Sequence, residues 1–350
     1  MRVLQVDAGR EWRGGQNQVR LLSRELSRDS SVEVVLVTQR GSELARRAAA
    51  VGVTVQEIPW SIGLDPRAAW RLYLTGRVFR PDVVHVHDSH ALSLTRVARW
   101  GDSPLSRATL VGHRRVDFHI RPRSNWFRAD RLIAVSAAVQ RVLVADGVSP
   151  RDITVIHDGI DPDEVRSRAA TPYGIRRRLG LAPGAPLAVN VAALVDHKDQ
   201  CTLIRAAALA RAQRPDLHWA IAGDGPLRPT LEREIAAANL GDRVHLLGYV
   251  PEADALIREA DVFVMSSKEE GLGSVILHAL VLEKPVVATA GGGIPEVVPA
   301  EFLVPVGDAS ALAAKVVDSL THPASPIPFP AQFTAKSMAD ATLALYRSLV

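Results

Sequence analysis

The chain has 350 residues, of which 47% are hydrophobic and 23% charged. These values are ordinary for a globular protein and exclude a disordered, collagen-like or coiled-coil chain. The length predicts two domains, each long enough to bury its own core. The one cysteine, Cys201, excludes an intrachain disulfide and a cysteine metal cluster, and it fits a reducing compartment.

The N-terminal sequence MRVLQVDAG predicts a buried strand and lacks the features of a signal peptide. The longest apolar run, residues 187–195, is too short to span a bilayer. We therefore expect a cytoplasmic protein that is either soluble or peripheral on the inner face of the cell membrane.

The net charge of +4 is unevenly distributed. Residues 1–178 carry 29 arginines against 19 acidic residues, whereas residues 179–350 carry 13 basic and 19 acidic residues. The excess of basic residues in 1–178 favours an anionic partner, such as a phospholipid surface or a phosphorylated acceptor. It is equally consistent with a surface charge bias that has no function. Because the basic residues come without a recognisable nucleic-acid-binding module, we expect no nucleic acid partner.

Short apolar strands alternate with helical stretches along the chain, which predicts βαβ units and parallel sheets with helices on both faces. In the first half we expect strands at 3–6, 32–37, 83–87, 109–112, 132–135 and 154–156, with helices at 17–27 and 43–51. In the second half we expect strands at 187–191, 218–222, 244–246, 262–265, 286–288 and 302–304, with helices at 199–212, 227–238, 253–259, 274–282 and 335–349.

The pattern predicts an α/β protein of two Rossmann-like, doubly wound domains that face a central cleft, with ligands at the carboxyl ends of the strands. Residues 1–165 form the first domain and 187–320 the second. A segment rich in proline, glycine and arginine, 166–186, is the expected linker. Four prolines within 321–330 begin a tail, 321–350, that ends in a helix.

Glycine turns follow several expected strands. Gly14 and Gly15 open a helix after the first strand, and Gly223 and Gly225 follow the strand at 218–222. Glycine lets a backbone approach a ligand closely, and the amides of a helix start favour an anion. A purely structural turn explains each pattern as well.

The segment 266–279 is the most informative. Glu270 precedes a glycine turn that opens a helix, so its carboxylate suits sugar hydroxyls while the turn amides suit a diphosphate. Ser274 and His278 share one face of that helix. Lys198, at a strand–helix junction, is a natural phosphate partner, and the alternative is a solvated lysine.

Taken in order, the segments GGQNQ, AGDGP, EEGLGSVILHAL and TAGGGIPEVV resemble the family 4 (group 1) glycosyltransferases of the GT-B fold. The shorter pieces PDVVHVHDSHA, VIHDGID and DRVHLLGYVPE add to this resemblance, which covers nearly the whole chain. It implies a nucleoside-diphosphate sugar held mainly by the second domain, retention of anomeric configuration and no metal. It also implies a C-terminal helix that crosses back to the first domain.

The resemblance implies a role for each matching residue. Glu270 would bond the donor sugar, and Lys198 would neutralise the diphosphate. The other residues of the predicted donor site are Gly14, Gly15, Gly223, Gly225, Tyr249, Val250, Gly271, Leu272, Gly273, Ser274 and His278. Among these, the turn at 271–274 would face the sugar and phosphates, and Tyr249 and Val250 would lie near the nucleobase.

Two positions depart from the family pattern. His278 stands where a second glutamate should bond the ribose, and an imidazole cannot accept from two hydroxyls. Ala193 stands where an arginine often meets the phosphates, with Arg13, Arg114 or Arg115 as candidate substitutes.

His113, expected just after the strand at 109–112, is a candidate donor or catalytic contact, with Arg115, Asp117 and a structural loop as alternatives. Residues 113–131 combine six arginines with Phe118, Trp126 and Phe127. This mixture suits an interfacial segment on anionic lipid, an acceptor-binding loop or a solvated loop.

Two patterns suggest a metal: the histidines of 85–90 and the pair Asp161 and Asp163. No distant partner is evident for the histidines, and the aspartate pair lies near the expected linker, so we expect no metal and no further cofactor. The sequence predicts a retaining, metal-independent glycosyltransferase whose acceptor is a cell-envelope sugar, a lipid-linked glycan or a small molecule. A sugar-nucleotide epimerase of the same fold and a non-catalytic partner protein are the alternatives, the latter supported by Ala193 and His278.

Overall fold

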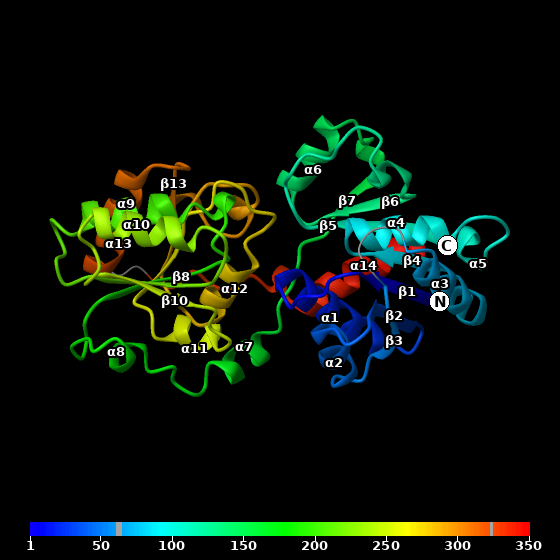
Figure 1. Cartoon of the computed structure of the whole chain (residues 1–350), viewed down its shortest axis with the longest axis horizontal. Coiled ribbons are helices and arrows are strands. Elements are labelled where there is room, and N and C mark those ends of the chain that lie inside the picture. The colour runs from blue at the N-terminus through cyan, green and yellow to red at the C-terminus, as the bar shows by residue number, and fades with distance from the viewer. Residues whose placement is uncertain (61–64, 323–324) are drawn as a thin grey trace. The chain divides into compact units, whose positions relative to one another are not determined.

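The computed structural model describes residues 1–60, 65–322 and 325–350. The chain folds as two compact units (Figure 1). The first unit comprises Met1–Ile160 and Ala331–Val350, and the second comprises Asp161–Pro330.

Seven parallel strands form the sheet of the first unit, in the order β3-β2-β1-β4-β5-β6-β7. The strands are β1 (Arg2–Asp7), β2 (Glu33–Gln39), β3 (Thr54–Ile58), β4 (Val83–Val86), β5 (Thr109–Arg114), β6 (Arg131–Ala134) and β7 (Ile153–Val155). The strand order reverses between β1 and β4, and the carboxyl ends at such a reversal are where ligands bind in doubly wound sheets.

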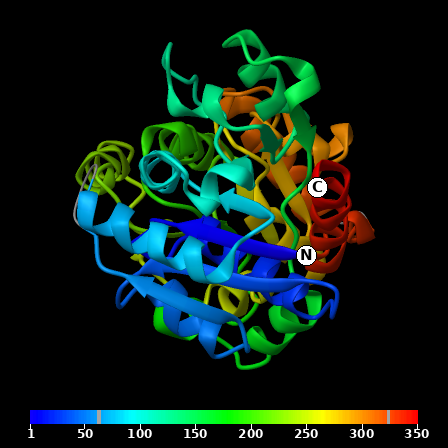
Figure 2. The same ribbon diagram turned by 90° about the vertical axis from the view of Figure 1, so that its right-hand side faces the viewer.

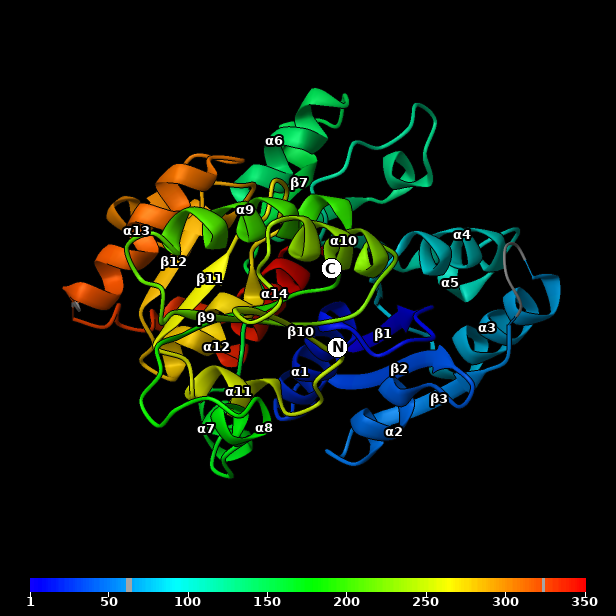
Figure 3. The ribbon, with the colours of Figure 1, turned by 60° about the vertical axis from the view of Figure 1, so that its left-hand side comes forward.

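Helices cover both faces of this sheet because its strands are apolar on both sides. They are α1 (Gly14–Ser27), α2 (Glu43–Ala49), α3 (Pro66–Phe79), α4 (Ser89–Ala98), α5 (Pro104–Arg107), α6 (Ala137–Ala145) and α14 (Ala335–Leu349). Leu22 of α1 and Met338 of α14 pack in one core cluster with Val3, Val83 and Val111 of the sheet. The connection through α3 from β3 back to β4 crosses the other face, where α3 contacts α4 and α5 (Figure 3).

Six parallel strands form the sheet of the second unit, in the order β10-β9-β8-β11-β12-β13. The strands are β8 (Leu187–Val191), β9 (His218–Ala222), β10 (Val244–Gly248), β11 (Val262–Met265), β12 (Val286–Thr289) and β13 (Leu303–Val304). The helices are α7 (Pro162–Arg168), α8 (Ile175–Arg178), α9 (Gln200–Ala210), α10 (Arg228–Ala237), α11 (Ala253–Arg258), α12 (Ser274–Val281) and α13 (Ala309–Thr321).

The second sheet also has a core on each face. Leu203 of α9 and Leu231 of α10 belong to one cluster, and Ile175 of α8 and Leu256 of α11 belong to the other. Figure 3 shows α9 and α10 on one side of the strands and α11 and α12 on the opposite side. The order reverses between β8 and β11, so their carboxyl ends form the switch point of this unit.

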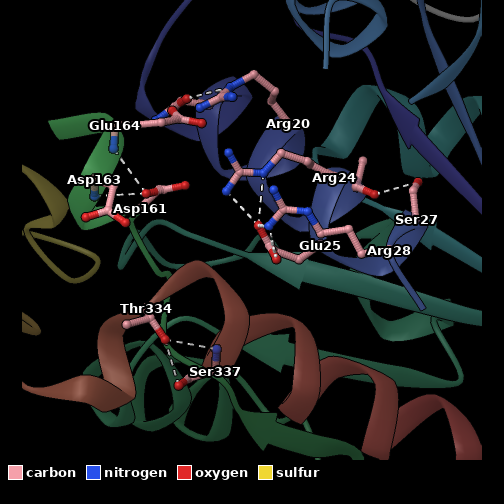
Figure 4. Close-up of polar contacts among 12 residues, drawn as sticks. Arg20, Arg24, Glu25, Ser27, Arg28, Asp161, Asp163, Glu164, Thr334 and Ser337 are labelled. Atoms are coloured by element: carbon pink, nitrogen blue, oxygen red, sulfur yellow. Dashed lines mark hydrogen bonds and ion pairs between the residues drawn. The ribbon is translucent and has the colours of Figure 1, made fainter. Parts of the chain in front are cut away.

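The predicted linker, 166–186, lies inside the second unit, whose boundary falls between Ile160 and Asp161. Within this segment Gly174 adopts a left-handed conformation before α8. Just ahead of it Asp161 caps α7 by accepting hydrogen bonds from the amides of Asp163 and Glu164 (Figure 4). The chain returns to the first unit at Ala331. There Thr334 caps α14 by accepting a hydrogen bond from the Ser337 amide (Figure 4).

Candidate active site

Lys198 and Glu270 meet at the switch point of the second unit. The loop after β8 carries Lys198, and the loop after β11 carries Glu270. Their side chains form an ion pair in which the ammonium group is 17% exposed and the carboxylate 14%. The hydroxyl of Ser266 ties the two loops together by donating to the Lys198 carbonyl oxygen at 2.9 Å. The two residues predicted to bind sugar and diphosphate therefore lie together at the edge where a doubly wound sheet binds its ligand.

The glycine turn beside this pair begins α12. Gly273 has a φ of 84°, a left-handed conformation that favours glycine. Leu272 is buried, and the Gly293 amide donates to the Glu270 carbonyl oxygen at 2.8 Å, which holds the turn in place. No side chain caps α12, so the first amides of the helix, which begins at Ser274, are available to an anion.

Gly223 and Gly225 serve the packing of the turn after β9. A Cβ atom at Gly223 would lie 1.8 Å from the carbonyl oxygen of Ala192, and one at Gly225 would lie 2.4 Å from that of Leu194. These glycines let the turn press against the loop that leads to Lys198. Their structural role is explained by the fold, and their contact with a donor stays a prediction.

His278 bonds to Asp254 of α11. Its Nδ1 lies 2.6 Å from the carboxylate, and Asp254 also accepts a hydrogen bond of 2.5 Å from Arg168 of α7. Burial raises the pKa of Asp254, but these two partners outweigh it and hold the pKa below its usual value. The carboxylate accepts the hydrogen bond from Nδ1, which leaves Nε2 as the ring nitrogen available to a hydroxyl.

The residues expected near the nucleobase differ from each other. Tyr249 is 66% exposed, and its ring is free to stack on a planar ligand. Val250 is buried and packs in the core cluster that contains Leu256. Any contact of Val250 with a ligand would therefore involve its backbone.

In the first unit, Gly14 and Gly15 begin α1 without a side-chain cap from Arg13. A Cβ atom at either glycine would meet nothing within 4 Å. The packing of the chain therefore does not require glycine here, in contrast to Gly223 and Gly225.

The structure corrects the expected position of His113. Strand β5 continues to Arg114, so His113 lies within the strand rather than in the loop after it, and it is 1% exposed. Arg115 donates to His113 Nδ1 at 3.0 Å and to Asp158 at 3.0 Å. Burial, with Arg115 and His85 alongside, holds the pKa of His113 well below its usual value. The imidazole is thus neutral and enclosed.

Three histidines lie close together in this region. His113 is the distant partner of His85 and His87 that the sequence alone did not reveal. Nitrogen atoms of His85, His87 and His113 lie within 4.8 Å of one another. Arg115 donates to Nδ1 of both His87 and His113, so their Nε2 atoms carry the protons. His85 Nδ1 lies 2.5 Å from the Tyr346 hydroxyl. The guanidinium of Arg115 donates hydrogen bonds to two of these rings, so the cluster is a hydrogen-bonded network rather than a set of metal ligands.

The other candidates are also engaged in the fold. Asp161 is the cap of α7 described above. Arg13 pairs with Glu11, and Arg115 pairs with Asp158. Arg114 is half-buried and donates to the Phe118 carbonyl oxygen. Each candidate substitute for the missing arginine at Ala193 therefore already has a partner.

The loop 113–131 is less exposed than its composition suggests. Trp126 is 4% exposed, and its ring would crowd a Cβ atom at Gly112. Phe127 is half-buried and lines a hollow of about 600 Å³ together with Arg123 and Arg128. Among the three aromatic residues only Phe118, at 41%, is well exposed.

Comparison with known proteins agrees with this arrangement. Residues 12–164 match the model described as Glycosyltransferase Family 4, and residues 174–335 match that of Glycosyl transferases group 1. The 2-deoxystreptamine glucosyltransferase of Streptomyces kanamyceticus is 32% identical over 206 residues, which are 56% of this chain and 53% of that protein. The chain thus spans about half the length of this relative.

Two further comparisons extend over most of the chain. The 2-deoxystreptamine N-acetyl-D-glucosaminyltransferase of Streptomyces fradiae is 29% identical over 359 residues, with 88% of this chain and 82% of that protein covered. The crystal structure of Anabaena Alr3699/HepE in complex with UDP and glucose has a TM-score of 0.82 at 21% identity and covers 99% of this chain and 100% of that one. The chain therefore belongs to the family 4 (group 1) glycosyltransferases and has their GT-B fold.

Proposed function

We propose that the protein is a retaining, metal-independent glycosyltransferase that moves a sugar from a nucleoside-diphosphate sugar to an acceptor hydroxyl. The observation that carries the proposal is the pairing of Lys198 with Glu270 beside the glycine turn of α12. A cation, uncapped helix amides and a carboxylate together suit a ligand that has both phosphates and hydroxyls.

The chemistry follows from these charges. The bond from the anomeric carbon to the diphosphate breaks, and negative charge develops on the leaving phosphate. Lys198 and the amides at the start of α12 stabilise that charge without a metal ion. Glu270 accepts hydrogen bonds from the donor sugar, and the acceptor hydroxyl attacks from the face of the leaving group. The acceptor oxygen forms the new bond to the anomeric carbon on the face that the phosphate leaves, so the configuration is retained. The leaving phosphate takes the acceptor proton, so no protein base is required.

Uracil is the nucleobase with the most support, because the similar structure of Alr3699/HepE is in complex with UDP and glucose. The relatives from Streptomyces are named for 2-deoxystreptamine, which supports a small-molecule acceptor. We also propose a peripheral location at the inner face of the cell membrane, with a lipid-linked or cell-envelope acceptor as the alternative to a small molecule. The excess of arginine over acidic residues in 1–178 supports this part of the proposal. Among the described residues, no helix is both long and apolar enough to cross a membrane.

A donor screen tests the proposal. UDP-, GDP-, ADP- and dTDP-sugars are incubated with a mixture of acceptors with and without EDTA, and products are detected by mass spectrometry. Formation of a glycoside that is insensitive to EDTA, with an unchanged anomeric configuration by NMR, is the expected result. An isomerised nucleotide sugar formed without acceptor would assign an epimerase instead, and nucleotide binding without turnover would assign a non-catalytic partner protein.

A further inference from the structure

Helix α3 of the first unit has an outer face that carries large apolar side chains. Its inner face packs on the unit, with Ala68 and Leu72 buried and Gly76 so close to α5 that a Cβ atom would lie 2.5 Å from the Leu105 side chain. The outer face exposes three residues spaced four apart: Trp70 at 59%, Leu74 at 42% and Val78 at 86%. Residues at this spacing form one stripe along a helix. Figure 2 shows α3, in light blue, at the front of the first unit.

The same face carries arginines that have no counter-ion. Arg67, Arg71, Arg77 and Arg80 are exposed, and none of them forms an ion pair with any residue in 1–60, 65–322 or 325–350. Some exposed arginines of the unit do pair: on α2 both Arg46 and Arg47 bond to Glu43. The helix itself, Pro66–Phe79, contains no acidic residue. These arginines therefore form no ion pair with the described residues, although Glu33 and Glu57 line a hollow beside Arg71.

No neighbouring element covers the stripe where it meets the sheet. A hollow of about 680 Å³ lies between α3 and the edge strand β3, and Leu74 and Val78 line its helical side. A second exposed tryptophan, Trp100 at 88%, follows α4, which packs against α3.

We propose that the outer face of α3 docks the protein on an anionic phospholipid surface. The arginines alternate with the apolar side chains around the face, with Arg71 next to Trp70 and Arg77 next to Val78. A protein interface usually depletes charge from its apolar centre, whereas lipid headgroups supply phosphates at the same depth as the apolar boundary. Tryptophan rings and the long stems of arginine both suit that boundary.

This surface replaces the loop 113–131 as the expected lipid contact. That loop buries Trp126 and half-buries Phe127, so it offers few apolar groups to a bilayer. The inference rests on the peripheral location proposed above and names the surface responsible for it.

Vesicle flotation tests the inference on the whole chain, with phosphatidylglycerol-containing vesicles and with pure phosphatidylcholine vesicles. The wild-type protein should float only with the anionic vesicles, and added salt should release it. The double variant R67Q/R77Q should partition roughly 25-fold less, since each basic side chain near an anionic surface contributes about five-fold. The apolar variant W70S/V78S should also lose binding.

Matched controls carry the same changes elsewhere. R141Q/R151Q removes two exposed, unpaired arginines of the first unit, and L209S/V306S removes two exposed apolar residues of the second. Both controls should float like the wild type, and thermal melting checks that all variants are folded. Sedimentation velocity of wild type and W70S/V78S, over a range of concentrations, tests for self-association.

The outcomes separate the two proposals. Wild-type flotation that the α3 variants retain would overturn the α3 surface and leave the peripheral location standing. If the wild type does not bind anionic vesicles but transfers sugar to a soluble acceptor, both the docking role of α3 and the peripheral location are wrong. The proposed transferase activity would then still stand. A concentration-dependent dimer that W70S/V78S abolishes, without vesicle binding, would assign the face to contact between copies.

Discussion

The ammonium group of Lys198 forms an ion pair with the carboxylate of Glu270, 72 residues further along the chain. Strands β8 and β11 are neighbours in the sheet, so the loops after them meet at the same edge. Both charges are mostly buried, and a buried charge is costly unless it is paired. The ion pair meets that requirement for both side chains. A diphosphate would give Lys198 a second anionic partner at this position.

The two partners should have separable roles. Glu270→Gln removes the carboxylate but leaves Lys198, so turnover should fall by about 10²–10³-fold, as when one charged or polar contact to the transition state is lost. Stabilisation of the protein by UDP, GDP, ADP or dTDP should persist in this variant. Lys198→Met should abolish that nucleotide-dependent rise in melting temperature, which for a nucleotide at 100 times Kd corresponds to roughly 2.7 kcal/mol.

Lys268→Met is the matched control for this pair, because Lys268 is a neighbouring lysine that faces Asp196 at 3.5 Å and is 42% exposed. It should behave like the wild type in both assays. Full turnover in Glu270→Gln would remove Glu270 from the site.

The glycines should divide into structural and ligand-facing positions. Gly223→Ala places a methyl group 1.8 Å from a carbonyl oxygen and forces a residue with a φ of 149° out of its conformation, so the free energy of unfolding should fall by about 3 kcal/mol. Gly15→Ala meets open space inside a helix, so stability should rise by about 0.5–1 kcal/mol. Urea denaturation measures both, with Gly241→Ala as an open-space control.

If the Gly15 backbone faces a donor, Gly15→Ala should weaken donor binding although it stabilises the chain. Donor affinity by calorimetry, compared with the unfolding free energy, separates the two effects. A stabilised variant with wild-type affinity would show that α1 begins away from the ligand.

His278 should accept a hydroxyl through Nε2 because Asp254 holds the Nδ1 proton. His278→Glu would put a second carboxylate beside Asp254 and should lower stability by about 1–2 kcal/mol, since like charges at this distance repel. The double variant H278E/D254N should regain that stability and should bind the nucleotide more tightly than the wild type. Melting temperatures with and without nucleotide report both quantities, and equal nucleotide affinity in wild type and double variant would place His278 away from the ribose.

Acid should destabilise the first unit through its buried histidines. Burial holds the pKa values of His85, His87 and His113 well below their usual range, so these rings stay neutral when folded and gain protons when unfolded. Their contribution is present above about pH 6.5 and is lost as pH falls below it, by up to about 1.4 kcal/mol per pH unit for each ring. Asp7 has the opposite effect and offsets the contribution of about one ring. Burial and Asp88 raise its pKa to about 6, so in mild acid the folded state binds a proton at Asp7 that the unfolded state does not.

Urea midpoints at pH 7.5 and 5.5 measure this dependence. His87→Gln removes one of the titrating rings and should flatten the slope by about one proton. A midpoint that stays constant over this range in the wild type would contradict the buried, neutral state of the cluster.

The sequence predicted the fold well where strands are buried on both faces. The segments 187–191, 218–222 and 262–265 were predicted with the bounds that the structure shows, because a short run of mostly apolar residues is typical of a central parallel strand. Strand β3, TVQEI, was missed because it lies at the sheet edge and exposes polar side chains. Helix α3 was missed because its exposed Trp70, Leu74 and Val78 hide the polar face that marks an ordinary surface helix.

The candidate site was predicted in part for a similar reason. Order along the chain placed Lys198 and Glu270 after strands, and parallel topology then brings such loops together. The end of β5 cannot be located from apolar residues alone, because Arg115 and Asp158 supply buried partners that let His113 and Arg114 continue the strand. The bond between His278 and Asp254 depends on packing between α12 and α11, which no local pattern reports.

The contribution of α14 to the first unit affects how the protein is made. Ala335, Met338, Ala339, Leu343 and Tyr346 belong to a core whose other buried members lie before residue 160, whereas the second unit is one continuous stretch. A ribosome therefore releases the first sheet with one face only partly covered, by α1, and the later unit is able to fold before the earlier one is finished. Ending translation at residue 330 would leave that face open to water and to chaperones, even though the strands beneath it had already been synthesised.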